Sequence, residues 1–279
     1  MKKISRRSFL AAAGLSVAAL ALTACGGSSA STASSVASSA ASSEAASTSA
    51  AAGELATVEA GKLTMATNAA FPPYEMTTDA GEFEGIDIET AQAIADKLGL
   101  ELQIDDMDFD AALLSVQQGK ADIVMAGVTV TDERKAVMDF SDSYATGIQS
   151  IIVPEGSDIA SPDDLAGKKI GTQRGTTGYI YCSDDFGDDN VVAYDDGLTA
   201  VQALNNGQVD AVVIDNAPAK EFVAANPGLV ILDTSYAEED YAIGMAKGSS
   251  LEAAVNAALE ELKADGTLQA IVDKYITAE

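Results

Sequence analysis

The sequence contains no histidine, no tryptophan and only two cysteines in 279 residues. Without histidine the chain cannot form a Ser-His-Asp triad or a Cys-His pair, and it lacks the commonest metal ligand. The two cysteines, Cys25 and Cys182, are too few for a zinc site built from thiolates. We therefore expect no metal and no cofactor, and enzymes that depend on histidine are excluded.

Basic residues are also scarce, with 16 Lys and Arg against 43 Asp and Glu and a net charge of −27. Such a chain repels a phosphate backbone, so we expect no nucleic-acid partner. Adsorption to anionic lipid by charge alone is disfavoured for the same reason. The hydrophobic content of 47% is sufficient for a buried core in one large or two small domains.

The N-terminus has the organisation of an export signal. Basic residues in the first seven positions precede the apolar run Phe9–Leu22, which is shorter than the roughly 20 residues of a membrane-spanning helix. Ser5–Leu10 resembles a twin-arginine export signal, and a Sec route is the alternative. Leu22–Cys25 resembles the bacterial lipobox, in which the cysteine is lipidated. We therefore assign residues 1–24 to the signal and predict a lipid such as palmitate on Cys25. An ordinary secretory signal with an incidental cysteine is the competing interpretation.

Residues 25–54 consist almost entirely of Ser, Ala, Thr and Gly. This composition cannot bury enough apolar surface to offset the entropy of ordering, so it predicts a flexible tether. Signal, anchor and tether together predict an exported protein, held by its lipid alone on the outer face of the cell membrane or on the periplasmic side. Cys182 is then the single cysteine of the folded part, and we expect it to be a small core residue.

Beyond residue 55, short apolar runs alternate with segments of helical period, which predicts an α/β fold. We expect helices over Ile88–Leu98, after the capped start Ser161–Asp164, over Ser249–Ala264 and over Leu268–Tyr275. The predicted strands are Leu63–Thr67, Leu100–Ile104, Ile123–Ala126, Ile151–Val153, Lys169–Thr172, Val191–Ala193, Val209–Ile214 and Val230–Leu232.

Two segments that lie 88 residues apart match each other. Val116–Val124 aligns with Leu204–Val212, and each has a helix end, a glycine and an Asp that opens an apolar strand. The match predicts two similar α/β lobes, unless it is a coincidence of a common unit. The same offset pairs Gly127 with Asp215, each just past its strand, where open α/β sheets bind ligands. Two such strand ends facing each other form a cleft.

Seven stretches of the folded part stand in a specific order: Asn68–Glu75, Gly85–Ile88, Met107–Phe109, Ala126–Arg134, Asp139–Ser141, Gly171–Gly178 and Ile214–Pro218. Together they resemble the polar amino-acid solute-binding proteins of ABC importers, the family-3 extracellular binding proteins. The resemblance covers residues 60 to 276. It is the ordered set that is specific, since no single stretch would be.

The resemblance implies a two-lobe type II periplasmic-binding-protein fold. Lobe 1 would comprise residues 55–144 and 242–279, and lobe 2 residues 149–236. Two hinge segments would cross between them, near Tyr144–Ile148 and near Ala237–Tyr241. The family further implies a monomeric binding protein that captures one free amino acid and delivers it to the membrane subunits of an ABC permease.

A zwitterionic amino acid needs a cation for its carboxylate and an anion with further acceptors for its ammonium, because either charge is costly to bury unpaired. Beyond the signal the chain has two arginines, Arg134 and Arg174. Arg134 follows Thr131–Glu133, an N-cap and first helical turn, where a cation opposes the helix dipole. Bidentate binding of the ligand carboxylate explains it and matches the family motif. A surface salt bridge with Asp132 or a nearby acid is the competing interpretation.

Asp215 is the natural partner for the ligand ammonium, and it is also a candidate N-cap for the residues that follow. Thr177 lies in Gly175–Gly178, a glycine-rich helix entrance that favours an anion such as the α-carboxylate. This entrance lacks the Gly-Lys-Ser/Thr ending of a phosphate loop, so nucleotide binding is not expected.

The remaining ligand contacts come from the resemblance. Two positions contact the ligand backbone, two aromatic rings flank its side chain unless they are core residues, and two amides face its side-chain end. These are, in the same order, Gly127 and Thr129, Phe71 and Phe109, and Asn68 and Gln173. No catalytic residue is assigned.

Two other functions fit the same fold class. A dehydratase acting on a small cyclic acid would need a positioned general acid, for which an intact amino-acid clamp leaves little reason. A sensory module would need a further signalling segment, which we do not expect after residue 279. Asn68 stands where many relatives carry an acid, which argues against a strictly cationic ligand, although Glu75 or Asp108 would supply a charge. We expect a polar amino acid, neutral or cationic.

Overall fold

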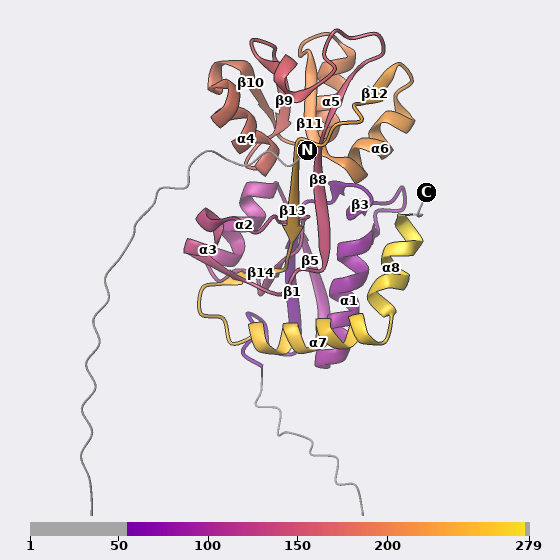
Figure 1. The fold of residues 1–279 in the computed structure, drawn as a ribbon. Helices are drawn as coiled ribbons and strands as arrows, with labels where there is room; N and C mark the ends of the chain where they lie inside the picture. Colours follow the sequence, from indigo (N-terminus) through magenta and orange to yellow (C-terminus); the bar gives the residue numbers. More distant parts are fainter. Residues whose placement is uncertain (1–54, 277–279) are drawn as a thin grey trace, which may run out of the picture. The chain divides into compact units, whose positions relative to one another are not determined.

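The computed structural model describes residues 55–276. The predicted signal, the lipidation site Cys25 and the Ser/Ala tether lie outside the described residues. Within the described part, the strands form two main sheets and one short three-stranded sheet (Figure 1). We call the elements around the first main sheet lobe 1 and those around the second main sheet lobe 2.

Lobe 1 contains a sheet with the strand order β5-β1-β6-β14-β7. β1 pairs in parallel with β5 and β6, whereas β14 pairs antiparallel with β6 and β7. Its strands are β1 (Lys62–Thr67), β5 (Glu101–Asp106), β6 (Ile123–Val124), β7 (Met138–Phe140) and β14 (Gly244–Ala246). The helices are α1 (Ile86–Leu98), α2 (Phe109–Gln117), α3 (Asp132–Val137), α7 (Glu252–Ala264) and α8 (Thr267–Tyr275), and the short sheet is β2 (Ala70–Phe71), β3 (Glu75–Thr77) and β4 (Phe83–Glu84).

Lobe 2 contains a sheet with the strand order β10-β9-β11-β8-β12, and β13 pairs with β8. β9 is parallel to β10 and β11, whereas β8 is antiparallel to β11 and β12. The strands are β8 (Ala145–Pro154), β9 (Ile170–Gln173), β10 (Val191–Tyr194), β11 (Ala211–Asp215), β12 (Leu229–Ile231) and β13 (Ala237–Tyr241). The helices are α4 (Thr177–Phe186), α5 (Gly197–Asn205) and α6 (Asn216–Ala225), with the 3₁₀ turns η1 (Pro162–Leu165) and η2 (Asp188–Asn190).

β8 and β13 are the connections between the lobes. They run side by side and antiparallel, with Ala237 opposite Gln149 and Tyr241 opposite Ala145 (Figure 1). β8 follows β7 of lobe 1 along the chain, and β13 leads from lobe 2 to β14 of lobe 1. The two crossing segments predicted from the sequence are confirmed.

The two segments that match in sequence share their local structure. α2 and α5 are each followed by a glycine with positive φ, Gly119 at 66° and Gly207 at 67°. Asp122 Oδ2 accepts a 2.7 Å hydrogen bond from the Thr64 N–H. Asp210 Oδ2 accepts a bond of the same length from the Lys169 N–H. Both lobes therefore contain the same helix–glycine–strand unit, in which an aspartate accepts a hydrogen bond from the backbone of an adjacent segment.

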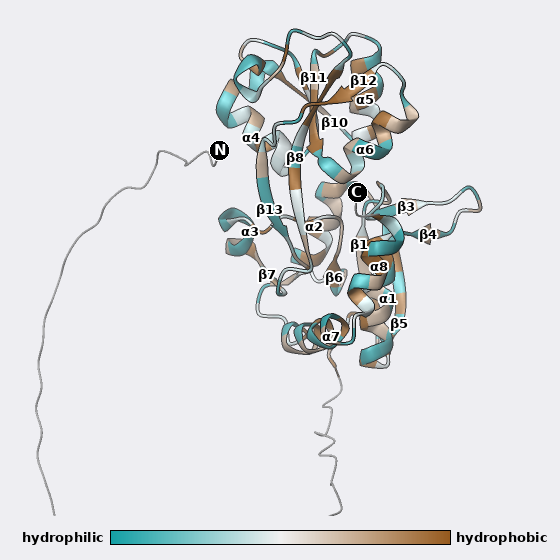
Figure 2. Cartoon of the chain, turned by 45° about the vertical axis from the view of Figure 1, so that its right-hand side comes forward, coloured by the Kyte–Doolittle hydropathy of each residue, from teal (hydrophilic) through white to brown (hydrophobic). Residues whose placement is uncertain are grey.

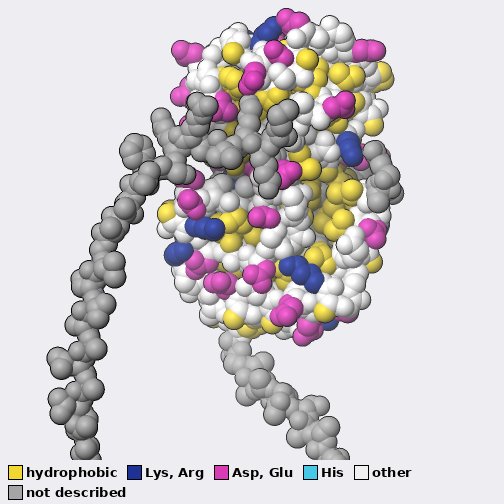
Figure 3. Space-filling view, viewed as in Figure 1, with side chains coloured by type: hydrophobic (Ala, Val, Ile, Leu, Met, Phe, Trp, Pro, Cys, Tyr) yellow, Lys and Arg dark blue, Asp and Glu magenta, His cyan; other side chains and the backbone are white. Residues whose placement is uncertain are grey.

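Apolar residues are concentrated on the strands and on the inner faces of the helices (Figure 2). Cys182 is fully buried in the lobe 2 core beside Ile170 and Val213, so its predicted place is confirmed. Asp and Glu side chains are spread over the surface among few Lys and Arg (Figure 3). Within residues 55–276, no helix has the length and apolar character needed to cross a bilayer.

Two expectations about secondary structure are corrected. The capped start at Ser161 opens only the four-residue 3₁₀ turn η1, not a longer helix. Its cap is real, since Asp164 Oδ2 accepts bonds from the N–H and the Oγ of Ser161, each 2.9 Å long. Strands β2, β3, β4, β7 and β14 were absent from the predicted set, because two or three residues are too few to show a period.

Candidate functional site

The candidate site is a pocket between the lobes that brings together residues from both. Its lining contains eight of the nine ligand contacts expected from the sequence, together with five further residues. The lining is Asn68, Phe71, Glu75, Phe109, Ala126, Gly127, Thr129, Arg134, Gln149, Gln173, Thr176, Thr177 and Tyr241. The cavity volume is about 20 Å³, which is room for about one water molecule. An amino acid therefore enters only when the lobes or the lining side chains move apart.

Arg134 provides the cation of the pocket. It lies in the first turn of α3, where its own N–H donates to the N-cap hydroxyl of Thr131. Its guanidinium donates to two carbonyls, through Nη1 to Thr129 O at 2.8 Å and through Nη2 to Gly175 O at 3.1 Å. The guanidinium carbon lies 5.4 Å from the ring centroid of Phe109. Arg134 thus forms hydrogen bonds with residues of both lobes, and its guanidinium lies over the ring of Phe109.

Arg134 is only 8% exposed, and burial lowers the pKa of its guanidinium, while Glu239 acts in the opposite direction. Among the described residues, no carboxylate oxygen forms an ion pair with it within 4 Å. The predicted alternative, a surface salt bridge with Asp132, is therefore not formed. Arg174 differs: its side chain is 56% exposed and its Nη2 lies 3.7 Å from Asp195 Oδ1.

The amides at the side-chain end of the site bind each other across the junction. Asn68 follows β1 and donates from Nδ2 to Met107 O at 3.0 Å. Gln173, the last residue of β9, donates from Nε2 to Asn68 Oδ1 at 2.8 Å. Phe71 on β2 and Phe109 at the start of α2 also line this part of the pocket. Two amides and two rings thus lie together in the pocket lining, and their contact with a ligand side chain stays a prediction.

The entrance to α4 lies on the lobe 2 side. Thr176 is the N-cap and its hydroxyl accepts from Tyr179 N, as expected for a capped helix start. Thr177, the first helical residue, is buried, and its Oγ1 lies 3.4 Å from that of Thr129 in lobe 1. Gly127, on the lobe 1 side, has φ of 54°, and its N–H donates to Asp87 Oδ2 at 3.0 Å.

Asp215 ends β11 and is the one expected contact that is absent from the pocket lining. Its Oδ1 accepts from Ala217 N at 3.0 Å and its Oδ2 from Ile148 N at 2.8 Å. The N-cap interpretation is therefore confirmed, and binding of the ligand ammonium stays a prediction. Burial raises the pKa of Asp215 to about 6, and its two backbone bonds act in the opposite direction.

Five lining residues and the adjacent Glu239 are outside the nine expected contacts, and of these only Glu75 was considered from the sequence, as a source of charge. Gln149, Tyr241 and Glu239 come from the hinge strands β8 and β13, and Glu75 from β3. The sequence carries no signal for Glu239, because its neighbours Glu238 and Asp240 are also acidic and only the structure shows that Glu239 is on the buried face of β13. Glu75 is fully buried, and both its carboxyl oxygens lack a hydrogen-bond partner.

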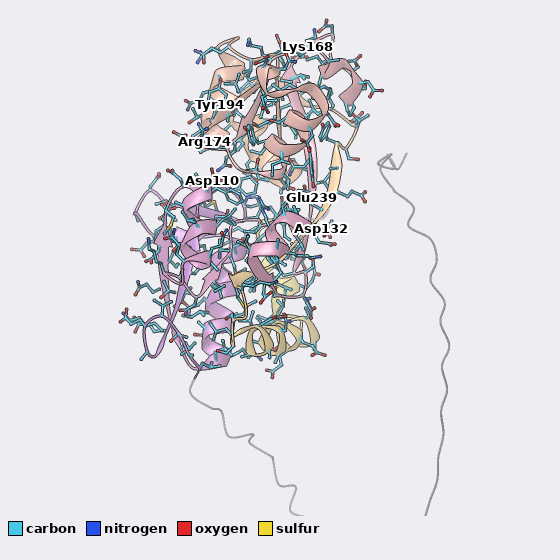
Figure 4. All side chains as sticks on the ribbon, turned by 90° about the vertical axis from the view of Figure 1, so that its left-hand side faces the viewer. Asp110, Asp132, Lys168, Arg174, Tyr194 and Glu239 are labelled. Carbon is cyan, nitrogen blue, oxygen red and sulfur yellow. The ribbon has the colours of Figure 1, made fainter. Side chains whose placement is uncertain are left out.

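The charged groups are arranged for a small molecule with charges of both signs. The cation Arg134 and the carboxyl group of Glu75 line the pocket, and Glu239 lies behind the lining, where it accepts hydrogen bonds from Thr129 and Thr177. Within the described residues, no group of three or more Cys, Asp or Glu is placed to hold a metal ion. Figure 4 shows Glu239 at the junction of the lobes, with Asp110 and Arg174 at the opposite side of the junction in this view.

Comparison with known proteins identifies relatives over nearly all of the described part. The family model of bacterial extracellular solute-binding proteins, family 3, matches residues 63–278. The L-cystine-binding protein TcyJ of Escherichia coli strain K12 is 34% identical over 226 residues, which cover 79% of this chain and 85% of the relative.

Two solved structures show the same fold. An ancestral arginine-binding protein bound to arginine has 43% identity, covers 77% of this chain and 98% of its own, and superimposes with a TM-score of 0.74. An ancestral arginine-binding protein bound to glutamine has 42% identity, covers 79% and 100%, and gives a TM-score of 0.75. The predicted type II periplasmic-binding-protein fold is thereby confirmed.

Proposed function

Because this chain belongs to the bacterial extracellular solute-binding proteins, family 3, we propose that it captures a polar amino acid, neutral or cationic, between its lobes. It then delivers the amino acid to the membrane subunits of an ABC permease, and it acts as a monomer. The relatives are named as amino-acid-binding proteins, which supports binding over the dehydratase alternative.

The proposal rests mainly on the environment of Arg134. It is a buried cation that lines the pocket, and among the described residues its guanidinium forms hydrogen bonds only with the carbonyls of Thr129 and Gly175. A guanidinium has five N–H donors, and these two bonds leave others for a ligand. A buried charge without a counter-charge is costly, so a carboxylate in the pocket would stabilise it. The α-carboxylate of an amino acid is the group that fits.

The side-chain end accommodates a donor-rich group. Glu75 lines the pocket, is fully buried, and has a pKa well above its usual range because of burial and the nearby carboxyl of Asp87. A guanidinium or ammonium beside Glu75 would favour its charged form and provide donors for its unpaired oxygens. The amides of Asn68 and Gln173 suit a neutral polar group equally. Arginine and glutamine, bound in the two solved relatives, are therefore the first ligands to test.

We also propose that binding is a hinge motion. Residues 55–144 and 242–279 would move as lobe 1 and residues 149–236 as lobe 2, about the paired strands β8 and β13. The ligand contacts come from both lobes, so a ligand binds the closed arrangement more tightly and shifts the population towards it. Small-angle scattering should show a smaller radius of gyration at saturation.

A thermal-shift screen against the twenty amino acids, followed by calorimetric titration, tests the function. An amino acid at a hundred times its dissociation constant should stabilise the protein by roughly 2.7 kcal/mol. We expect polar amino acids to raise the melting temperature and acidic or purely apolar ones to leave it unchanged. A screen in which none of the twenty raises the melting temperature would overturn the proposed function.

The attachment to the membrane is a separate proposal. We propose that the exported protein is anchored through a lipid on Cys25, because Leu22–Cys25 has the lipobox pattern. In Cys25→Ala the protein should leave the membrane fraction or keep its signal. If this variant fractionates as the parent does and has the same mature mass apart from the substitution, the anchor is assigned wrongly.

A further inference from the structure

Glu239 is a buried carboxylate on the hinge strand β13. Only 6% of the residue is exposed, whereas its neighbours Glu238 and Asp240 are exposed. Its Oε2 accepts three hydrogen bonds: from Thr129 Oγ1 at 2.9 Å, from Thr177 Oγ1 at 2.9 Å and from Gln149 Nε2 at 3.0 Å. The three donors belong to lobe 1, lobe 2 and the hinge. Glu239 therefore joins all three parts at the back of the pocket.

The charge of Glu239 has no cationic partner in direct contact. Within residues 55–276, no Lys or Arg nitrogen forms an ion pair with it, and no donor lies within hydrogen-bond distance of its Oε1. The Tyr181 hydroxyl is nevertheless near Glu239, since burial raises the pKa of that tyrosine and Glu239 raises it further. Neutral hydroxyl and amide donors stabilise a carboxylate but do not cancel its charge. A cation in the adjacent pocket would therefore be attracted towards the two threonines in front of it.

The hydrogen-bond directions at the threonines are fixed by this contact. A threonine hydroxyl has one proton and two lone pairs. Thr129 and Thr177 both direct their single proton to Glu239, and the 3.4 Å separation of their own oxygens is a longer contact than either of these bonds. Towards the pocket, which both residues line, the hydroxyls then offer only lone pairs. They accept hydrogen bonds there and cannot donate to a ligand.

We propose that Glu239 is a specificity-determining residue that makes the pocket select an α-ammonium group. It orients the hydroxyls of Thr129 and Thr177 as acceptors, and its negative charge lies directly behind them. This inference rests on the proposed function, since it concerns the same pocket. A ligand without the amino group would face two acceptors and a carboxylate with no donor to satisfy them, which is unfavourable.

Paired ligands test this role. L-Arginine and 5-guanidinopentanoate differ only in the α-amino group, as do L-glutamine and 4-carbamoylbutanoate, and the corresponding pair serves for any other amino acid that the screen selects. In the parent protein the amino acid should bind far more tightly than its deaminated counterpart. In Glu239→Gln, which keeps an acceptor oxygen but loses the charge, this preference should fall about tenfold. In Glu239→Ala, which frees both hydroxyls, the preference should fall further.

Glu238→Gln is the matched control, because it removes a carboxylate from the exposed face of the same strand. The affinity of the deaminated ligands for the Glu239→Gln variant should equal or exceed their affinity for the parent protein. A structural defect would instead weaken both members of each pair equally. If the parent prefers the amino acid and Glu239→Gln keeps that preference within twofold, the role of Glu239 is refuted while the proposed function stands. If the parent binds no amino acid, it is the proposed function that fails.

Discussion

The two lobes share one structural unit but present opposite chemistry to the pocket. Each has a helix, a glycine in the left-handed region and an aspartate that accepts a backbone hydrogen bond from an adjacent segment. These residues are Gly119 and Asp122 in lobe 1 and Gly207 and Asp210 in lobe 2. Three residues beyond the matched segments, at Gly127 and Asp215, the chemistry diverges. Gly127 donates its N–H to a carboxylate, whereas the equivalent Asp215 is itself a buried carboxylate.

This difference between equivalent positions of the lobes separates residues that the fold requires from residues that are candidates for binding. Glycine and aspartate recur because both lobes must end a helix and begin a buried parallel strand. The charged groups do not recur: lobe 1 lines the pocket with Arg134, whereas lobe 2 lines it with the entrance of α4 and keeps Asp215 buried outside the lining. A ligand with a carboxylate and an ammonium is suited to this asymmetry. Substitutions that remove these groups one at a time should weaken binding or change stability, and the largest effect is expected at Arg134.

Arg134→Ala should remove the cation of lobe 1 and weaken amino-acid binding by roughly 30-fold or more. Truncating one member of a buried, hydrogen-bonded charge pair costs about 2–5 kcal/mol, and about 1.4 kcal/mol corresponds to a factor of ten. Arg134→Lys keeps the charge but loses the planar fork, so it should restore only part of the affinity. Calorimetric titration with the best amino acid of the screen measures all three proteins.

Arg174→Ala is the control for this prediction. Arg174 is exposed and its nearest carboxylate contact is the loose one to Asp195, so its loss should change the dissociation constant by less than about threefold. If Arg174→Ala abolishes binding and Arg134→Ala does not, the cation has been assigned to the wrong lobe.

Asp215→Asn should weaken binding by a similar or somewhat smaller factor, because it removes the predicted counter-charge of the ligand ammonium from lobe 2. It should also lower the free energy of unfolding by about 1 kcal/mol. Both carboxylate oxygens accept backbone N–H bonds, and an amide can replace only one of them. Titration and chemical denaturation are both needed. A loss of stability with an unchanged dissociation constant would show that Asp215 is a helix cap alone.

Gly175→Ala should hinder the approach of the two lobes and weaken binding by roughly tenfold. A methyl carbon at this position would lie 1.7 Å from Oδ1 of Asp110 on the opposite lobe, and the φ of Gly175, +74°, is already unfavourable for alanine. The second variant Asp110→Ser separates these causes. If the lobes meet as described, Gly175→Ala combined with Asp110→Ser should bind more tightly than Gly175→Ala alone. Equal affinities would exclude an interlobe clash.

Much of the fold was predictable from local pattern. Long strands such as β1 and β11 have apolar runs, and α1 and α7 have clear helical periods with glycine or capping signals. The hinge strand β13 was located only through the resemblance. Its residues Glu238, Glu239 and Asp240 give no apolar pattern, since the strand is stabilised by its pairing with β8.

The candidate site was predictable where the chemistry is carried by one motif. Arg134 and Thr177 were assigned from their places at helix starts, and the structure brings both to the pocket. Glu75 and Glu239 acquire their character from burial by distant segments, which composition and spacing do not contain. Asp215 shows the opposite case: its strand-end position suggested both a cap and a ligand contact, and only the backbone geometry identifies the cap.

The smallest expected effect concerns the carboxylate that holds Gly127 in lobe 1. Burial raises the pKa of Asp87 to about 6, and the N–H bond from Gly127 partly offsets this. In the unfolded chain an aspartate has a pKa of about 3.9, so between about pH 4 and 6 the folded protein binds more protons than the unfolded one. The contribution of Asp87 to the free energy of unfolding therefore falls as the pH rises through this window.

Asp87→Asn removes this titration and keeps an acceptor for the Gly127 N–H. The melting temperature of the variant minus that of the parent should be a few degrees larger at pH 7.5 than at pH 5. A change on the order of 1 kcal/mol shifts the melting temperature by about 2–4 °C in a protein of this size. Calorimetric melting at the two pH values, with the exposed-face variant Glu238→Gln as control, measures the difference. Asp215 titrates in the same window, so the parent itself should also lose stability between pH 5 and 7. A melting difference between Asp87→Asn and the parent that is the same at both pH values would contradict the raised pKa of Asp87.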